Sequence, residues 1–311
     1  MLDIKDGFFK FSHVYASALW GGDAIPRLYG RADAPSPCSE SWEISAHPHG
    51  MSVVKGGAYD GMPLDELVRL LGRDLVGSSA PDATRFPLLF KLIDARLPLS
   101  VQVHPSEKTA SLSGGEPKSE AWCVIDAKPG AKIYAGIRGG ADEGAFLEAA
   151  SRGDAVARLL VERSVASGDM VFLPGGTPHA IGSGNLIYEV QQTSDTTFRL
   201  YDWGRVGADG KPRELHVREA AKAIDYSLAP QKMQRGALRT PYFFMRDIAI
   251  EEPVSVKPDG STFTAVFVAS GNLTVASAGE SILVPAVGEE VVLEPVGGPV
   301  RAILTTLPHD A

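Results

Sequence analysis

The feature that most restricts the fold of this chain is its division into short alternating segments separated by glycine- and proline-rich turns. The 311 residues include 33 glycines and 22 prolines, which suits many short strands joined by tight turns. Alternation of apolar and polar side chains predicts strands at 97–103, 121–126, 132–137, 169–174 and 185–192. From Thr240 to Pro308 nearly the whole sequence is strand-like. We therefore predict a mainly β protein with a few short helices.

Three stretches depart from this alternation and are predicted to be helical. Residues 62–75 repeat apolar side chains at spacings of three and four. Residues 140–160 favour one or two short helices interrupted at Gly153, and 214–227 are rich in good helix formers. Helical patterns end near Pro230, so a domain boundary is expected there. Residues 1–230 would form the domain that carries the chemistry, and 231–311 a smaller β domain without a metal.

Composition and charge exclude several classes of protein. The net charge of −8, from 30 basic and 38 acidic residues, is a poor match to a general nucleic-acid binder. No apolar run approaches the roughly 20 residues of a membrane span, and the start of the chain is too acidic for a signal peptide. The two cysteines, Cys38 and Cys123, favour a reducing compartment. We expect a cytoplasmic protein without nucleic-acid or membrane partners.

One predicted strand places polar side chains together. Side chains alternate along a strand, so Ser100, Gln102 and His104 share one face while apolar residues occupy the other. Gln102 and His104 are spaced to share one metal ion or one substrate. The alternative is an exposed edge strand with an ordinary polar face.

A second segment, 168–179, has the spacing of a metal-binding turn. Gly168 is followed by five residues and Pro174, one residue and Gly176, and two residues and His179. This pattern resembles the second metal motif of the cupin superfamily, whose members are jelly-roll β-barrels. The resemblance implies two cupin-type barrels, the second of them degenerate because Glu290 lies where the histidine would be expected.

The first cupin motif usually supplies a histidine pair and then a glutamate. Here Gln102 stands in place of the first histidine, and the only well-placed acid is Glu120. With His104 and His179 these residues would give two imidazoles and two oxygen ligands, a set that suits Zn²⁺. Their summed charge of about −1 would leave the ion positive enough to stabilise a developing oxyanion.

Five blocks of the chain resemble, in the same order, the class I zinc-dependent mannose-6-phosphate isomerases (phosphomannose isomerases) in their short bacterial form. The blocks are 40–50, 86–105, 117–126, 176–184 and 188–205. By this similarity one zinc ion per chain is held by Gln102, His104, Glu120 and His179. The resemblance implies an aldose–ketose isomerase of carbohydrate metabolism that interconverts mannose 6-phosphate and fructose 6-phosphate through a cis-enediol. A monomer or homodimer is expected.

The same resemblance implies a set of residues around the sugar phosphate. Catalytic roles would fall on Arg199, Lys118 and Asp195, and substrate contacts on Lys91, Arg205 and Ser100. Arginine suits bidentate contact with phosphate, and lysine suits neutralisation by a point charge. Each cation could instead be a solvated surface residue or part of a structural salt bridge. Asp195 could be the base, an orienter of Arg199 or a turn-capping residue.

Two histidines at strand spacing, His47 and His49, form a possible competing metal site. Pro48 between them disfavours a regular central strand, and the family resemblance places no ligand there. We interpret His47 as a packed residue or part of a pocket wall.

Two other functions remain open from the sequence. One is another cupin enzyme, an iron dioxygenase or a different sugar isomerase. The other is a sugar-phosphate sensor that keeps the metal but lacks the base.

Overall fold

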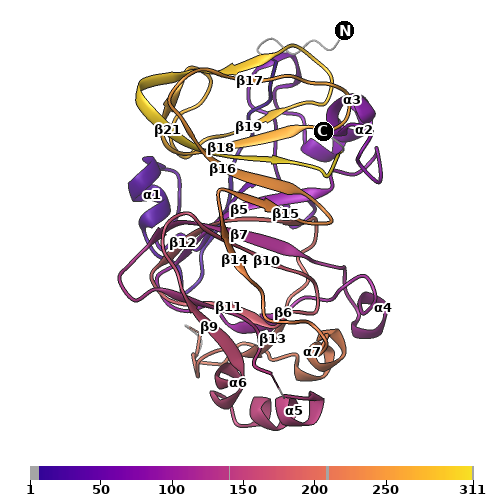
Figure 1. The fold of residues 1–311 in the computed structure, drawn as a ribbon, viewed down its shortest axis with the longest axis vertical. Helices are drawn as coiled ribbons and strands as arrows, with labels where there is room; N and C mark the ends of the chain where they lie inside the picture. Colours follow the sequence, from indigo (N-terminus) through magenta and orange to yellow (C-terminus); the bar gives the residue numbers. More distant parts are fainter. Residues whose placement is uncertain (1–6, 140, 208–209, 310–311) are drawn as a thin grey trace.

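The computed structural model describes residues 7–139, 141–207 and 210–309. The chain is mainly β with a few short helices, which confirms the predicted class (Figure 1). The short helical segments are α1 (Ala24–Tyr29), η1 (Gly57–Tyr59), α2 (Leu64–Leu71), α3 (Arg73–Val76), α4 (Ala110–Ser113), α5 (Glu143–Ser151), α6 (Ala155–Arg158) and α7 (Val217–Ala223). Within the described ranges, no helix is both long enough and apolar enough to span a bilayer.

The larger sheet forms the middle of the molecule (Figure 1). In the described part of the chain it has seven strands, each antiparallel to its neighbours. Their spatial order is β1 (Val14–Ala16), β2 (Glu40–Ile44), β5 (Leu88–Ala95), β12 (Asn185–Gln192), β7 (Glu120–Ala127), β10 (Asp169–Leu173) and β14 (Met233–Arg235).

A second sheet faces the larger one. Among the described residues it has five strands, in the order β13 (Phe198–Tyr201), β6 (Val101–Val103), β11 (His179–Ile181), β8 (Lys132–Ile137) and β9 (Leu160–Ser164). Trp122 and Ile187 of the larger sheet share a buried cluster with Ile133 and Ile181 of the smaller one. The two sheets therefore enclose a common core, and the polar residues discussed below lie at its edge.

The C-terminal residues form a separate sheet. Its order is β15 (Ala237–Arg239), β16 (Phe244–Ile250), β21 (Pro295–Thr306), β18 (Thr264–Leu273) and β19 (Ser281–Val284). The remaining described strands form two small antiparallel pairs. These are β17 (Val254–Val256) with β20 (Val291–Leu293), and β3 (Ala46–His47) with β4 (Gly50–Met51). The boundary near residue 230 and the two-barrel arrangement stay predictions.

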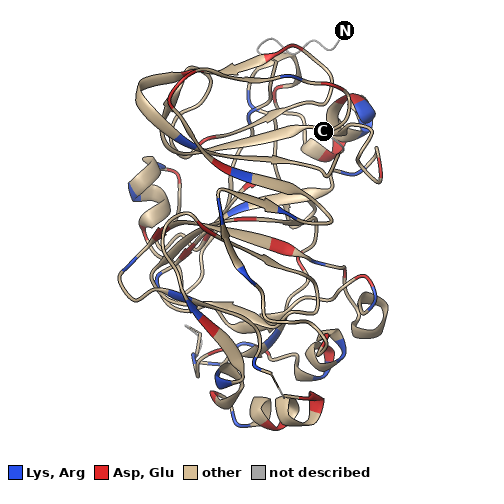
Figure 2. Ribbon diagram, viewed as in Figure 1, with Lys and Arg blue, Asp and Glu red and all other residues tan. Residues whose placement is uncertain are grey.

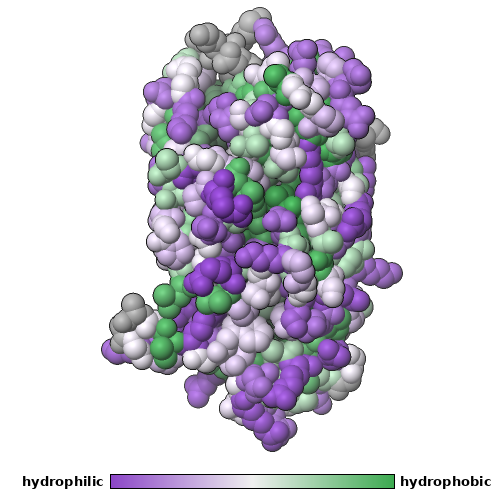
Figure 3. Space-filling model, turned by 90° about the vertical axis from the view of Figure 1, so that its left-hand side faces the viewer, coloured by the Kyte–Doolittle hydropathy of each residue, from purple (hydrophilic) through white to green (hydrophobic). Residues whose placement is uncertain are grey.

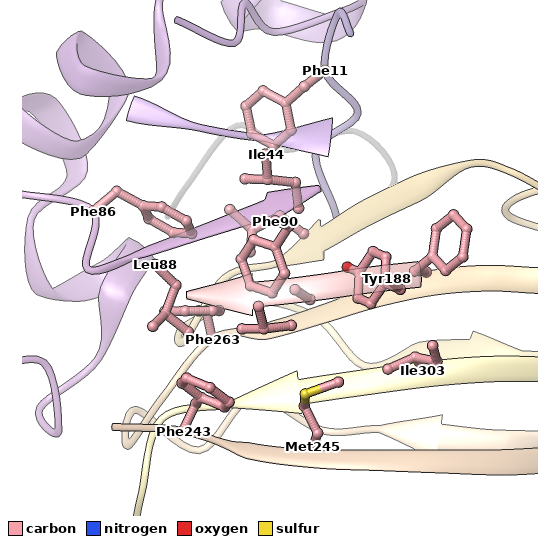
Figure 4. Close-up of a cluster of buried hydrophobic side chains, with 14 of the residues drawn as sticks. Phe11, Ile44, Phe86, Leu88, Phe90, Tyr188, Phe243, Met245, Phe263 and Ile303 are labelled. Carbon is pink, nitrogen blue, oxygen red and sulfur yellow. The ribbon is translucent and has the colours of Figure 1, made fainter. Parts of the chain in front are cut away.

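A large aromatic core joins distant parts of the chain (Figure 4). The ring centroids of Phe86 and Phe263 lie 5.0 Å apart, and Tyr188 of β12 stacks on Phe267 of β18 at 4.5 Å. Phe9 exchanges two backbone hydrogen bonds of 2.9 Å with Leu283, so the start of the described chain extends the C-terminal sheet. Aromatic burial of this kind is a major source of stability.

The predicted helices are present but shorter. The stretch 62–75 divides into α2 and α3 because Gly72 has a φ of +52°, which a right-handed helix excludes. The break predicted at Gly153 separates α5 from α6; Gly140, at the edge of that prediction, lies outside the described residues. Of the helix predicted at 214–227, only α7 is helical. Of the strand predicted at 97–103, only β6 forms, and it lies after Pro98.

Charged residues of both signs are interspersed over the ribbon (Figure 2). The face shown in Figure 3 has apolar side chains grouped near its middle and hydrophilic ones around them. The ribbon in Figure 2 does not divide into one basic and one acidic side.

Candidate active site

Strand register brings three of the predicted site residues side by side. In the smaller sheet Gln102 of β6 pairs with His179 of β11 on one side and with Arg199 of β13 on the other. Directly paired residues project from the same face of a sheet. Ser100 precedes β6, is buried, and its Oγ donates to Gln102 Oε1 at 3.2 Å.

His104 and Glu120 meet His179 at this edge. Glu120 opens β7, and its Oε2 lies 3.2 Å from His104 Nε2 while its Oε1 lies 3.3 Å from His179 Nε2. The turn before His179 is tied to His104 because the Gly176 amide donates to the His104 carbonyl at 2.7 Å. One ligand atom from each of the three residues lies within 4.8 Å of the other two. All three side chains are buried.

Backbone carbonyls set the tautomer of both histidines. His104 Nδ1 donates to Thr196 O at 2.7 Å, and His179 Nδ1 donates to Thr177 O at 2.9 Å. Burial lowers the pKa of His179, and burial together with the Lys118 cation lowers the pKa of His104 to about 3. Both imidazoles are therefore neutral at pH 7, with the Nε2 lone pairs directed toward Glu120.

Glu120 is ionised although it is buried. Burial alone would raise its pKa, but the Lys118 cation outweighs that effect and holds the pKa of Glu120 well below its usual range. Lys118 Nζ lies 3.1 Å from Glu120 Oε2. Burial would lower the pKa of Lys118, yet Glu120 and Glu189 raise it, so Lys118 stays a cation.

The three residues fit a divalent cation. Within the described residues, His104 Nε2 and Glu120 Oε1 are buried atoms without a hydrogen-bond partner. Acceptors that face one another without a proton are costly to bury. Two neutral imidazoles and a carboxylate are a donor set that suits Zn²⁺. Gln102 turns its amide Nε2 toward His179 Nε2 at 3.3 Å, so its oxygen would face a metal only after a half-turn of the amide.

A second cluster, His47, His49 and Asp195, has similar spacing but a different proton arrangement. The backbone amide of His49 donates to His47 Nδ1 at 3.2 Å, which requires the proton of a neutral His47 ring to be on Nε2. His49 Nδ1 lies 2.9 Å from Asp195 Oδ2. His47 therefore lacks the free lone pair that His104 and His179 offer. His47 is buried, and its ring packs against those of Trp42 and His49.

A cavity of about 330 Å³ opens beside Gln102 and Lys118. Its volume is at the lower end of the range for small-ligand sites. Predicted residues in its wall are Lys91, Ser100, Gln102, Lys118, Asp195 and Arg199. The structure thus brings together most of the proposed substrate residues. Asp195 contacts His49; the alternative in which it orients Arg199 finds no support among its described hydrogen bonds and ion pairs.

Sequence reasoning missed Glu189, which also lines the cavity. Trp122 Nε1 donates to Glu189 Oε2 at 2.8 Å, and Lys91 Nζ lies 4.0 Å from Oε1. Burial, and then the negative charge of Glu120, raise the pKa of Glu189 to about 7. The signal available in the sequence was an acid inside the otherwise apolar strand 185–190. Glu40, 3.4 Å from Lys91 Nζ, was missed as well.

The arginines are arranged differently from the prediction. Arg205 does not line the cavity of Lys118: its Nη1 donates to Pro98 O at 2.6 Å, and it also pairs with Asp202. Arg213, which sequence reasoning did not select, lines that cavity beside Arg199. Burial and the nearby Arg213 cation lower the pKa of Arg199. No sequence motif marked Arg213, because only the fold brings it next to Arg199.

Known proteins resemble the chain in sequence and in structure. Residues 8–128 match the model of the type I phosphomannose isomerase catalytic domain. The chain is 44% identical to mannose-6-phosphate isomerase of Streptococcus mutans over 66% of this chain and 64% of that protein. It is 39% identical to mannose-6-phosphate isomerase ManA of Bacillus subtilis over 71% of this chain and 69% of that protein. The alignments thus span about two thirds of each relative.

A crystal structure of mannose 6-phosphate isomerase from Bacillus subtilis superposes with a TM-score of 0.83 and 28% identity, covering 96% of this chain and 99% of that one. The resemblance inferred from the sequence is confirmed by these matches. The chain belongs to the type I phosphomannose isomerase family.

Proposed function

We propose that this protein is a zinc-dependent mannose-6-phosphate isomerase that interconverts mannose 6-phosphate and fructose 6-phosphate. The observation that supports this most is the buried group of His104, Glu120 and His179, with two acceptor atoms left without partners beside a cavity lined by cations. His104, Glu120 and His179 would hold one zinc ion per chain, with Gln102 as the fourth ligand after its amide turns. The ion would polarise the sugar oxygens next to the carbon that loses its proton.

The residues of the cavity suit the remaining chemistry. The reaction moves a proton from C2 to C1 through a cis-enediol, so it needs a group that binds and releases a proton near neutral pH. Glu189 meets this requirement because its pKa is raised to about 7 and it lines the cavity. Lys118 stays protonated and would stabilise negative charge that develops on the enediol oxygens. Asp195, which also lines the cavity, would contact the sugar.

Substrate recognition is proposed to use the cations of the same cavity. Arg199 would contact the substrate, Ser100 would donate to it, and Lys91 would orient the carboxylates around it. Lys91 is held between Glu40 at 3.4 Å and Glu189 at 4.0 Å, and it lies 4.4 Å from the Trp42 ring centre. A cytoplasmic location and a monomeric or homodimeric state stay predictions.

The direct test is turnover of mannose 6-phosphate. Protein loaded with zinc, its metal content measured, should convert mannose 6-phosphate to fructose 6-phosphate in a coupled assay. Absence of conversion at full metal occupancy would refute the proposal. Tight binding of the sugar phosphate without turnover would favour a sensor instead.

A further inference from the structure

The cavity has an excess of positive charge at one end only. Its two lysines are each matched by a carboxylate: Lys118 by the buried Glu120 at 3.1 Å and Lys91 by the half-buried Glu40 at 3.4 Å. The other two cations in the wall are Arg199 and Arg213. An anionic group of a ligand would therefore be attracted to the arginine end of the cavity.

Three guanidinium groups gather at that end around one buried carboxylate. Asp202, whose side chain is 7% exposed, accepts from Arg213 Nε at 2.8 Å and from Arg213 Nη2 at 2.6 Å. It also accepts from Arg205 Nη2, and Arg205 is tied to Pro98 O. The nearby Glu214 side chain is 84% exposed, so solvent screens its charge. Arg199, Arg205 and Arg213 thus carry three positive charges around the single buried carboxylate of Asp202.

The hydrogen-bond donors of two of these arginines are not used up. Arg199 Nη1 donates to Glu214 O at 2.9 Å, whereas Arg199 Nε is a buried atom without a partner in the described part of the chain. Arg213 binds Asp202 through Nε and Nη2, which leaves its Nη1 group outside that bidentate pair. Its side chain is 39% exposed and so accessible to a ligand. A buried donor without a partner is costly unless a ligand accepts from it.

We propose that Arg213 and Arg199 are the residues that contact the phosphate group of the substrate, and that Asp202 and Arg205 are positioning residues that hold Arg213 in place. This inference rests on the proposed function because it assigns the phosphate end of that same cavity. Two guanidinium groups present a planar set of donors to a dianion, which matches phosphate geometry. Arg205 acts through Asp202 and does not touch the substrate.

The test compares Arg213→Ala with the zinc-loaded parent protein, using inorganic phosphate and mannose 6-phosphate as probes. Loss of a charge-assisted contact is expected to weaken calorimetric binding of inorganic phosphate, and to raise KM for mannose 6-phosphate, by roughly 10- to 100-fold. The value of kcat should stay within about threefold, because uniform binding is removed. Arg218→Ala, which removes an exposed cation outside the cavity, is the matched control and should leave both values unchanged.

Two further variants separate binding from folding. Arg213→Lys keeps the charge but loses the bidentate pair, so an intermediate rise in KM is expected even if Arg213→Ala proves unstable. Asp202→Asn should raise KM less than Arg213→Ala does. Unchanged phosphate binding in folded, zinc-loaded Arg213→Ala, or in Arg213→Lys if the alanine variant does not fold, would overturn the inference. If the parent protein binds phosphate through Arg213 but shows no turnover, the isomerase proposal fails and this inference stands.

Discussion

His104 Nε2 and Glu120 Oε2 lie 3.2 Å apart in the buried interior with no proton between them. His104 donates its only ring proton to the carbonyl of Thr196, and Glu120 is ionised because the Lys118 cation outweighs its burial. Two acceptors at this distance repel each other in a medium of low dielectric. A divalent cation between them removes the repulsion, which is the physical basis of the proposed metal site.

Replacement of His179 by alanine should remove the metal and leave the fold. The change deletes one of the four proposed ligands, so affinity for zinc should fall by more than the roughly 10- to 100-fold typical of a lost outer-shell partner. Isomerase activity should fall with metal content. Metal analysis after dialysis and far-UV circular dichroism check both parts. Full retention of zinc by the variant would exclude His179 as a ligand.

Glu189 should make stability depend on pH in the metal-free protein. Its pKa rises from about 4.5 when unfolded to about 7 when folded, so the folded state holds an extra proton between these values. Stability should therefore fall as pH rises from about 4.5 to about 7, by at most about 3 kcal/mol at 1.36 kcal/mol for each pH unit. Urea denaturation at pH 5 and pH 8 measures the difference.

Glu189→Gln provides the matched comparison because it is neutral at every pH. The loss of stability across this window should be smaller in the metal-free variant than in the metal-free parent. Equal pH dependence of stability in both proteins would show that Glu189 is not the titrating group.

Gly175→Ala should disturb the metal site through the backbone. A Cβ at this position would lie 2.6 Å from Pro105 O and 2.7 Å from Ser106 Cα, and backbone atoms cannot move aside cheaply. The turn before His179 would separate from the segment after His104, so zinc affinity should fall, by about tenfold or more. Gly139→Ala, where an added Cβ meets nothing within 4 Å, should bind zinc as the parent does. Calorimetry on the metal-free proteins distinguishes the two.

Arg31→Met should strongly destabilise the fold. Arg31 forms two 2.8 Å hydrogen bonds to Glu43 and also donates to Gly279 O near the C-terminal sheet, and the Glu43 side chain is buried. Removal of the Arg31 guanidinium leaves the buried Glu43 carboxylate without its main partner. This should lower the free energy of unfolding by about 3–5 kcal/mol. Arg69→Met breaks only the exposed 2.9 Å pair with Asp65 and should cost less than about 1 kcal/mol. Urea denaturation compares the two, and similar losses would contradict this account.

The sequence predicted the local patterns well because those patterns depend on neighbouring residues. Alternation located β8 and β12 with the bounds that the structure has, and the glycine break separated α5 from α6. Strand alternation placed Gln102 and His104 on one face, and turn spacing marked His179, because both are short-range properties. Glu120 was selected through the resemblance to the family. The helix predicted at 62–75 was interrupted by Gly72, since a positive φ is set by the local turn and not by apolar spacing.

Only the tertiary structure decided which charges meet. Glu189 and Glu120 lie on different strands, yet burial together with the nearby Glu120 charge raises the pKa of Glu189 to about 7. Arg213 reaches the cavity whereas Arg205 turns away to Pro98, although both follow the same strand. Coulomb interaction and desolvation depend on distance and burial in space, and the spacing of residues along the chain contains neither quantity. The sequence therefore determined the candidate ligands, and the fold determined their protonation and the positively charged end of the cavity.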